Sequence, residues 1–390
     1  MKKRVNYILL IIFFLLIDAT IGYAKQNKKN LTEDIKAIYI SYLEYLDNFV
    51  GNSKSINEKK IDKMIDNINN LGFNWIIVHV SPFSDSIYNS KYFPYSHTLT
   101  GMEGKNPGFD YLEYFIKSAH QKKISVHAWI NPYRISDTQN IDKLSKENPA
   151  YNLIGTTHVK IDGKGIYYNP ASEIVKNILL DQIDELIRNY DIDGIHFDDY
   201  FYIQNDIDEY EYNNYINNVE YISKSTFRLN TINDFIKRVY KLIKKRNQNI
   251  IFSIAPDGNI NNNYKYHFAD VKEWLKKLEY VDVIMPQIYY GFDNQYKPFE
   301  QTVKEWQNIN EKNIKMVPVL AFYKLGKIDE DAGSGMNEWK ENKDIIMKQI
   351  NYINNQLGNG YALFRYDFLF NENYVNDNIL NEIENIKKNG

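Results

Sequence analysis

Two adjacent aspartates, Asp198 and Asp199, directly follow the apolar run GIHF in the segment YDIDGIHFDDYFY, residues 190–202. Two carboxylates held close together cannot both ionise cheaply, so the pKa of one of them rises. A carboxyl group with a raised pKa can donate a proton near neutral pH and take it back later in a reaction. The pair therefore indicates acid–base chemistry at the end of a strand, and the aromatic residues after it are expected to begin a lid.

The alternation of side chains along a strand decides which of these residues face a common site. Ile195 and Phe197 form the apolar, outward-facing set of the run, so His196 and Asp198 point inward. Asp199 falls on the outward side unless the strand bends after Asp198. An inward carboxylate is costly to bury unless it is paired or used in chemistry, so Asp198 is the first catalytic candidate.

Eight strand-like apolar runs alternate with amphipathic stretches along the chain. One such stretch, residues 61–71, repeats its apolar residues at the spacing of a helix with one buried face. Eight strand–helix alternations predict an α/β fold, a single-domain (β/α)8 TIM barrel over residues 36–390. The Tyr/Asn/Asp-rich segment 200–229 is predicted to be an insertion after strand 4. The runs are AIYIS (37–41), WIIVHV (75–80), ISVHAWI (124–130), DGIHF (193–197), IIFSIA (250–255), VDVIMPQIY (281–289), MVPVLAF (316–322) and YALFRY (361–366).

In such a barrel the site lies at the carboxyl ends of the strands, and polar and aromatic residues gather there in this chain. The inward positions supply three acidic catalytic candidates, Asp198, Asp199 and Asp257. Aromatic rings stack on sugar rings, whereas amide, imidazole and guanidinium groups bond to hydroxyls. The residues expected to contact a carbohydrate are His79, Asp85, Trp129, Asn131, Tyr133, Arg134, His196, Gln287, Tyr289, Arg365 and Asp367.

Three histidines on neighbouring predicted strands, His79, His127 and His196, raise the alternative of a zinc site. A related alternative is a deacetylase-like metalloenzyme that uses these histidines together with Asp85. The histidines lack a strong metal-ligand spacing, and we interpret each as a hydrogen-bonded wall or core residue. The chain has no Cys and no phosphate-binding glycine-rich turn. We therefore expect neither a cofactor nor a metal ion.

The N-terminus has the layout of a secretory signal peptide. Three basic residues at positions 2–4 precede an apolar run over residues 5–17, and small residues follow before position 25. We predict a signal peptide over residues 1–24, a polar leader over residues 25–35, and export from the cytoplasm. An uncleaved N-terminal membrane anchor is the alternative. The formal net charge of −3 gives no electrostatic footprint for nucleic acid.

Three longer stretches resemble the bacterial glycosyl hydrolase-like family 10 proteins, a group once described as a domain of unknown function. The stretches are YFPYSHTLTGMEGKNPGFDYLEYFIKSAHQKKISVHAWINPYR (92–134), YDIDGIHFDDYFY (190–202) and MPQIYYGF (285–292), and DEDAGSGMNEW (329–339) also matches. The resemblance implies a (β/α)8 barrel, export and hydrolysis of a glycosidic bond. The group includes a cell-envelope glycosidase that acts on peptidoglycan strands stripped of their peptides. The resemblance thus implies a polysaccharide substrate of this kind and is compatible with cell-wall association, and it gives no indication of a stable protein partner.

The chain departs from several patterns that would otherwise assign residue roles. Relatives are often lipoproteins, but this chain has no Cys to lipidate. Xylanases keep a Glu at the ends of strands 4 and 7, whereas strand 7 here ends LAFYK without an acid. The chitinase-like pattern DGxDxDxE is also broken, because His196 stands at its second Asp and Tyr200 at its Glu. Residue roles from those enzymes therefore do not transfer.

Glycoside hydrolysis ordinarily uses one carboxyl group as the acid and a second as the nucleophile or base. Asp198 is the first carboxyl group in this interpretation. Its partner is Asp199, Asp257 on the next strand, or Asp367 across the mouth of the barrel. The alternative from another class of protein is a barrel that binds glycan through its stacking residues without cleaving it.

Overall fold

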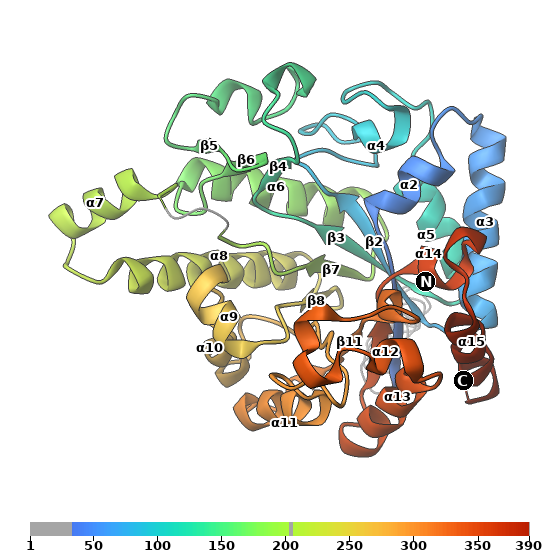
Figure 1. Cartoon of the computed structure of the whole chain (residues 1–390). Helices are drawn as coiled ribbons and strands as arrows, with labels where there is room; N and C mark the ends of the chain where they lie inside the picture. Colours follow the sequence, from blue (N-terminus) through green and yellow to red (C-terminus); the bar gives the residue numbers. More distant parts are fainter. Residues whose placement is uncertain (1–32, 203–205, 390) are drawn as a thin grey trace, which may run out of the picture.

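The structure, a computed structural model, describes residues 33–202 and 206–389. Within these residues nine parallel strands form one curled sheet surrounded by helices (Figure 1). The sheet order is β10-β9-β8-β7-β3-β2-β1-β12-β11. The strands are β1 (Ile35–Ile40), β2 (Trp75–Ser81), β3 (Ser125–Ile130), β7 (Gly194–Phe197), β8 (Ile251–Ile254), β9 (Val283–Ile284), β10 (Lys315–Met316), β11 (Val319–Leu320) and β12 (Gly360–Leu363).

The two edge strands of this sheet, β10 and β11, belong to one chain segment and are separated only by Val317 and Pro318. Val317 N donates to Ile284 O over 2.9 Å on one side, and Ala362 N donates to Pro318 O over 2.9 Å on the other. Proline has no N–H to give to a ladder, which accounts for the interruption. Counted as one strand, the segment closes the sheet, and the predicted (β/α)8 barrel is confirmed.

One covering helix follows each barrel strand in the described part of the chain and packs on the outside of the barrel (Figure 1). Helix α3 buries Ile61, Met64, Ile65 and Ile68 against the strands, as the spacing of these residues predicts. The covering helices are α3 (Lys54–Asn70), α5 (Tyr111–Gln121), α6 (Glu173–Asn189), α8 (Lys224–Arg246), α10 (Val271–Lys276), α11 (Phe299–Ile309), α13 (Ile345–Gln356) and α15 (Asp377–Asn389).

The predicted insertion after strand 4 is present between β7 and α8. It contains α7 (Glu209–Asn218), which has no buried residue and projects from the barrel (Figure 1). The insertion ends earlier than residue 229 because α8 already begins at Lys224. Ser223 caps that helix by accepting a hydrogen bond from Thr226 N over 3.1 Å, the signal that fixes its start.

Short elements complete the rim above the barrel. A three-stranded antiparallel sheet inserted after β3 was not predicted from the sequence; its strands are β4 (Arg134–Ser136), β5 (Val159–Asp162) and β6 (Gly165–Tyr168). The short helical segments are α2 (Tyr42–Asn48), α4 (His97–Thr100), η1 (Ile141–Lys143), η2 (Tyr151–Leu153), α9 (Ile260–Asn262), η3 (Asn263–His267), η4 (Phe322–Lys324), η5 (Glu330–Gly335), α12 (Glu338–Glu341), α14 (Tyr366–Phe370) and η6 (Glu372–Tyr374).

The apolar side chains form two separate cores. The larger one lies between the strands and the covering helices. The smaller one fills the inside of the barrel, and its members alternate with those of the larger core along every barrel strand except β7. The inner core comprises Ile35, Ala37, Tyr39, Trp75, Ile77, Trp129, Ile251, Ala255, Val283, Met285, Val317, Val319 and Ala362, with Tyr289 and Phe364 packed on it.

The predicted signal peptide, residues 1–24, and most of the predicted leader lie outside the described residues. None of the helices that the structure does describe is both long and apolar enough to cross a bilayer. Export and the alternative of an N-terminal anchor therefore both stay predictions.

Candidate active site

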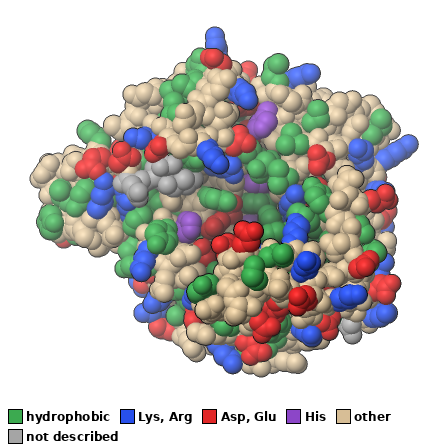
Figure 2. Space-filling view, viewed as in Figure 1, with side chains coloured by type: hydrophobic (Ala, Val, Ile, Leu, Met, Phe, Trp, Pro, Cys, Tyr) green, Lys and Arg blue, Asp and Glu red, His purple; other side chains and the backbone are tan. Residues whose placement is uncertain are grey.

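A pocket of about 270 Å³ lies over the barrel axis at the carboxyl ends of the strands. We call it the axial pocket. In the space-filling view, acidic and hydrophobic side chains gather in a central hollow of this face (Figure 2). The axial pocket is lined by Tyr39, Ser41, Tyr42, Leu43, His79, Trp129, Asn131, Arg134, Asp198, Asp199, Tyr200, Ala255, Gln287, Tyr289, Tyr323 and Phe364.

Asp198 and Asp199 lie side by side in the wall of the axial pocket. Asp198 is only 4% exposed, and its Oδ1 accepts a hydrogen bond from Tyr200 N over 3.3 Å. Burial, followed by the neighbouring charge of Asp199, raises the pKa of Asp198 well above its usual range. Burial also raises the pKa of Asp199. The two carboxyl groups therefore favour a state in which they carry one proton between them.

Asp199 reaches the pocket although the strand alternation points it outward. Strand β7 ends at Phe197, and Phe201 N donates to Asp199 O over 3.0 Å in the turn that follows. Gln287 Nε2 donates to Asp199 Oδ1 over 3.1 Å and holds the carboxylate toward the mouth. The expected bend after Asp198 is therefore present.

Stacked aromatic rings form the floor of the pocket. Trp129 lies flat against the His79 ring, with 3.6 Å between ring centroids and 8° between planes. Tyr39 meets Trp129 edge to face at 5.5 Å. Trp129 Nε1 donates to Asn131 Oδ1 over 3.1 Å, so the indole is fixed both by stacking and by a hydrogen bond. Burial lowers the pKa of His79 well below its usual range, and the imidazole is neutral there.

Arg134 supplies the positive charge of the pocket. It begins β4, so the unpredicted small sheet is what places it on the rim. Its guanidinium lies over the Phe83 ring at 4.8 Å and over the Tyr200 ring at 6.0 Å. The Arg134 charge acts to lower the pKa of Asp198, but less than burial raises it.

A second hollow of about 330 Å³, the lateral groove, continues the axial pocket sideways. The two hollows share Asp199, Gln287, Tyr289 and Tyr323. The groove also contains the candidate Asp257, whose Oδ1 accepts from Asn259 N over 2.7 Å and whose Oδ2 accepts from Asn262 Nδ2 over 3.1 Å. Because they share lining residues, the two hollows adjoin and make one cleft.

Five of the expected ligand contacts lie outside both hollows: His196, Tyr133, Asp85, Arg365 and Asp367. His196 is buried beneath the floor, where it bonds to Tyr39 Oη at 3.1 Å and to Ser253 Oγ at 2.8 Å. Tyr133 is buried in the layer between strands and helices, next to Phe235. Asp85 is buried in the loop after β2 and accepts from Phe83 N over 3.0 Å.

The expected inward positions on strand 8 differ by one residue from those observed. Ala362 and Phe364 face the barrel interior, so Arg365 points away from it. Arg365 pairs instead with Glu44 of α2 at 2.5 Å and lies 3.6 Å from Asp367. The placement of Arg365 and Asp367 at the mouth was therefore wrong, because the alternation of the apolar residues was read one position out of register.

Of the three histidines considered as zinc ligands, His196 is hydrogen-bonded as expected, whereas the ring nitrogens of His79 and His127 have no hydrogen-bond partner in the described residues and the two rings stack on tryptophans instead. His79 stacks on Trp129, and His127 stacks on Trp75 with centroids 3.8 Å apart. His127 fits there because Gly194 has no side chain; a Cβ at that position would lie 2.1 Å from His127 Nδ1. The described residues contain no group of three acidic, His or Cys side chains placed to hold a metal ion.

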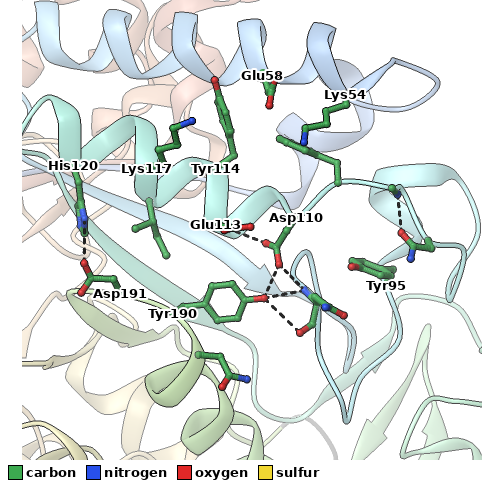
Figure 3. A pocket seen from close by; sticks show the side chains of 16 residues that line it. Lys54, Glu58, Tyr95, Asp110, Glu113, Tyr114, Lys117, His120, Tyr190 and Asp191 are labelled. Atoms are coloured by element: carbon green, nitrogen blue, oxygen red, sulfur yellow. Dashed lines mark hydrogen bonds and ion pairs between the residues drawn. The ribbon is translucent and has the colours of Figure 1, made fainter.

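A further hollow of about 1130 Å³ lies on the outer wall beside α3 and α5 rather than at the mouth. Several of its groups are engaged with one another: Tyr190 Oη donates to Asp110 Oδ2 over 2.6 Å, and His120 pairs with Asp191 (Figure 3). His120 also pairs with Asp193, which lies outside the hollow. This hollow has neither the paired carboxyl groups nor the strand ends of the axial pocket. The axial pocket and the lateral groove are therefore the candidate active site.

Several pocket residues were missed by reading the sequence. Tyr39 lies two positions after Ala37 in an inward-facing series, so alternation in the first run could have found it. Phe364 could have been found in the same way on strand 8. Ser41 and Tyr42 belong to the loop and helix after β1, and Tyr323 to the turn after β11, where no periodicity gives a direction.

A family model described as glycosyl hydrolase-like 10 matches residues 34–334. The glycosyl hydrolase YngK of Bacillus subtilis (strain 168) is 28% identical over 316 residues, which are 75% of this chain but only 61% of that protein. The glycosyl hydrolase DigH of Escherichia coli (strain K12) is 28% identical over 342 residues, 79% of this chain and 75% of DigH.

Solved structures share the barrel at low sequence identity. The PgaB (BpsB) glycoside hydrolase domain from Bordetella bronchiseptica superposes with a TM-score of 0.61 at 11% identity, covering 91% of this chain and 98% of that domain. An α-amylase from Geobacillus thermoleovorans, complexed with acarbose, gives 0.53 at 11% identity, covering 92% of this chain and 78% of the amylase. These likenesses establish the fold alone.

Proposed function

Since this chain belongs to the glycosyl hydrolase-like 10 family, we propose that it hydrolyses glycosidic bonds of a cell-envelope polysaccharide, using Asp198 and Asp199 at the mouth of the barrel. The observation that carries this proposal is the buried carboxyl pair in the wall of an aromatic-floored pocket. Membership of the family supports the reaction class, and the buried carboxyl pair supports the choice of Asp198 and Asp199 as the reacting residues.

In this proposal the pair supplies two of the groups that bond cleavage uses. A glycosidic oxygen leaves as an alcohol only if it receives a proton, and burial raises the pKa of Asp198, which favours the protonated form that can donate it. The second carboxyl group remains ionised and can stabilise the positive charge that develops on the sugar ring. Asp257 is the other candidate acid, and its place in the lateral groove makes it a contact for a neighbouring sugar unit in this proposal.

The walls of the cleft support a carbohydrate ligand. Trp129 and Tyr289 offer flat ring faces, and Asn131, Arg134 and Gln287 offer donors to hydroxyl or acetamido groups. For the substrate we propose glycan strands of N-acetylated sugars, with peptide-free peptidoglycan as the first choice. The support for that choice is the family resemblance together with the signal-like N-terminus.

The test is an assay for new reducing ends with three polymers: peptide-free peptidoglycan strands, chitin oligomers and xylan. We expect cleavage of the peptidoglycan strands. Cleavage of xylan alone would overturn the substrate while leaving the reaction class in place. Binding of a glycan with no release of reducing ends would instead identify a non-catalytic carbohydrate-binding barrel.

A further inference from the structure

The carboxyl groups that line the axial pocket all come from one wall. Among its described lining residues these groups are Asp198 and Asp199, which are consecutive in the chain after β7. The facing wall, from β1, the start of α2 and the end of β12, presents hydroxyl and apolar groups instead: Tyr39, Ser41, Tyr42, Leu43 and Phe364.

The nearest acidic residues beyond the pocket are held elsewhere. Asp257 lies in the lateral groove, on the strand beside β7, with both oxygens bonded to Asn259 and Asn262. Glu44 is buried behind the facing wall, where Oε2 accepts from Ser41 N over 2.8 Å and Oε1 pairs with Arg365. Neither of these carboxylates lines the axial pocket, nor do Asp329 and Asp331, which line the lateral groove.

This arrangement lacks the second carboxylate, on the opposite side of the sugar from the acid, that both ordinary mechanisms need. A retaining enzyme uses a carboxylate nucleophile across the sugar from the acid, about 5–5.5 Å away, and an inverting enzyme uses a carboxylate base on the opposite face, about 6.5–9.5 Å away. Two consecutive residues at one strand end reach the sugar from the same side. The nucleophile must therefore be a water molecule that no base activates, or a group of the substrate itself.

We propose that the substrate supplies its own nucleophile, the carbonyl oxygen of a 2-acetamido group, and that this chain is a retaining hydrolase specific for 2-acetamido sugars. The inference rests on the function proposed above and narrows its substrate. In it Asp198 is the general acid, and the Asp199 carboxylate accepts a hydrogen bond from the acetamido N–H.

The surroundings of Asp199 fit an acetamido group. Tyr289, Tyr323 and Phe364 pack around one another with centroids 5.7, 6.1 and 6.2 Å apart, so their rings form a small aromatic cup. Tyr289 and Tyr323 line both hollows together with Asp199. Such a cup can hold the methyl group, while Gln287 keeps the Asp199 carboxylate in place and favours its ionised form.

The chemistry balances without a cofactor. The acetamido oxygen bonds to C1 as the C1–O glycosidic bond breaks, and the Asp198 proton passes to the leaving oxygen. The resulting oxazolinium ring carries a positive charge, which Asp199 balances through the N–H hydrogen bond. Water then bonds to C1 and gives a proton to Asp198, and the ring bond from C1 to the acetamido oxygen opens. The acetamide is restored, and the anomeric configuration is retained.

The experiment uses one glycan polymer with different acyl groups. Peptide-free peptidoglycan strands are chemically de-N-acetylated and then re-acylated with acetyl, propionyl or trifluoroacetyl groups, and reducing ends are counted with time. Fluorine withdraws electrons from the carbonyl oxygen, so the trifluoroacetyl polymer should be cleaved about 100-fold more slowly than the acetyl polymer, a barrier change of about 2.7 kcal/mol. The propionyl polymer controls for size.

The cleavage rates and the configuration of the product distinguish participation of the acetamido group from its absence. Participation of the acetamido group is supported if the trifluoroacetyl polymer is cleaved slowly and the propionyl polymer is cleaved at close to the acetyl rate. It also requires that the product first detected by NMR has retained anomeric configuration. Equal rates for acetyl and trifluoroacetyl polymers, rapid cleavage of the de-N-acetylated polymer, or an inverted product would overturn it while leaving glycoside hydrolysis intact. If neither native nor re-acetylated strands are cleaved, the proposed function fails and this inference fails with it.

Discussion

Gln287 Nε2 donates one hydrogen bond to Asp199 Oδ1 over 3.1 Å and another to Ala255 O over 2.9 Å. The Gln287 side chain thereby connects the turn after β7 to the end of β8, and it fixes a carboxylate that strand alternation alone would point outward. This contact also lowers the pKa of Asp199 against the larger effect of burial.

Replacing Gln287 with Ala should therefore raise the pKa of Asp199. If Asp199 acts as a carboxylate, the acidic limb of the kcat/KM profile should move to higher pH, and kcat/KM at its optimum should fall by about tenfold, since a hydrogen bond to a charged group contributes about 1.5–3 kcal/mol. Gln182→Ala is the matched control, because Gln182 donates to Ser81 Oγ over 2.9 Å. An unmoved acidic limb in Gln287→Ala would contradict this role.

Trp129→Phe should weaken glycan binding. The variant keeps an aromatic ring against His79 but loses part of the stacking face and the N–H that Asn131 accepts, so KM should rise by a factor of ~2–10. Trp75→Phe is the control, because Trp75 stacks on His127 outside the axial pocket. Equal KM for both variants, with equal losses of thermal stability, would show that Trp129 only fills the barrel.

Asp367 should make the stability of the protein depend on pH. Burial, followed by the Glu44 charge, raises the pKa of Asp367 to about 7 in the folded protein. The folded state then keeps a proton that the unfolded state has already lost, so this contribution to stability falls as pH rises from about 4 to 7. Asp367→Asn should flatten that dependence in urea unfolding at pH 5 and pH 7.5. The exposed Asp137→Asn should not, and identical slopes for the two variants would refute the assignment.

The N-terminal prediction has a direct test by mass. Protein recovered from outside the cytoplasm should lack about the first 24 residues, because the basic, apolar and small-residue succession is the layout that signal peptidase recognises. Recovery of the full chain in a membrane fraction would establish an uncleaved anchor instead.

Sequence periodicity was sufficient to predict the barrel and half of the residues that line the axial pocket. The alternation of apolar residues placed Asp198, Trp129 and Gln287 correctly at the strand ends, because one side of each strand must pack under helices. It failed for Arg365, because strand 8 gives only a short apolar run, in which the alternation can be read in either register.

The remaining site residues depend on contacts that no local pattern encodes. Arg134 is at the rim because β4 pairs with β6, a strand more than thirty residues later in the chain. Asp199 faces the pocket because of a turn and a contact with Gln287, 88 residues away. Ser41 and Tyr323 come from loops, where the direction of a side chain is set by packing rather than by a repeat.

The measurement that tests the central claim most directly is the turnover of Asp198→Asn on peptide-free glycan strands, beside Asp199→Asn and Asp191→Asn. Asparagine keeps the shape and hydrogen-bonding capacity of aspartate but cannot give up and regain a proton. With an unchanged thermal unfolding transition, Asp198→Asn should lose ~100-fold or more of its turnover and Asp199→Asn should also be strongly impaired, whereas Asp191→Asn stays active. Turnover close to that of the unaltered protein in both Asp198→Asn and Asp199→Asn would remove this pair from the chemistry.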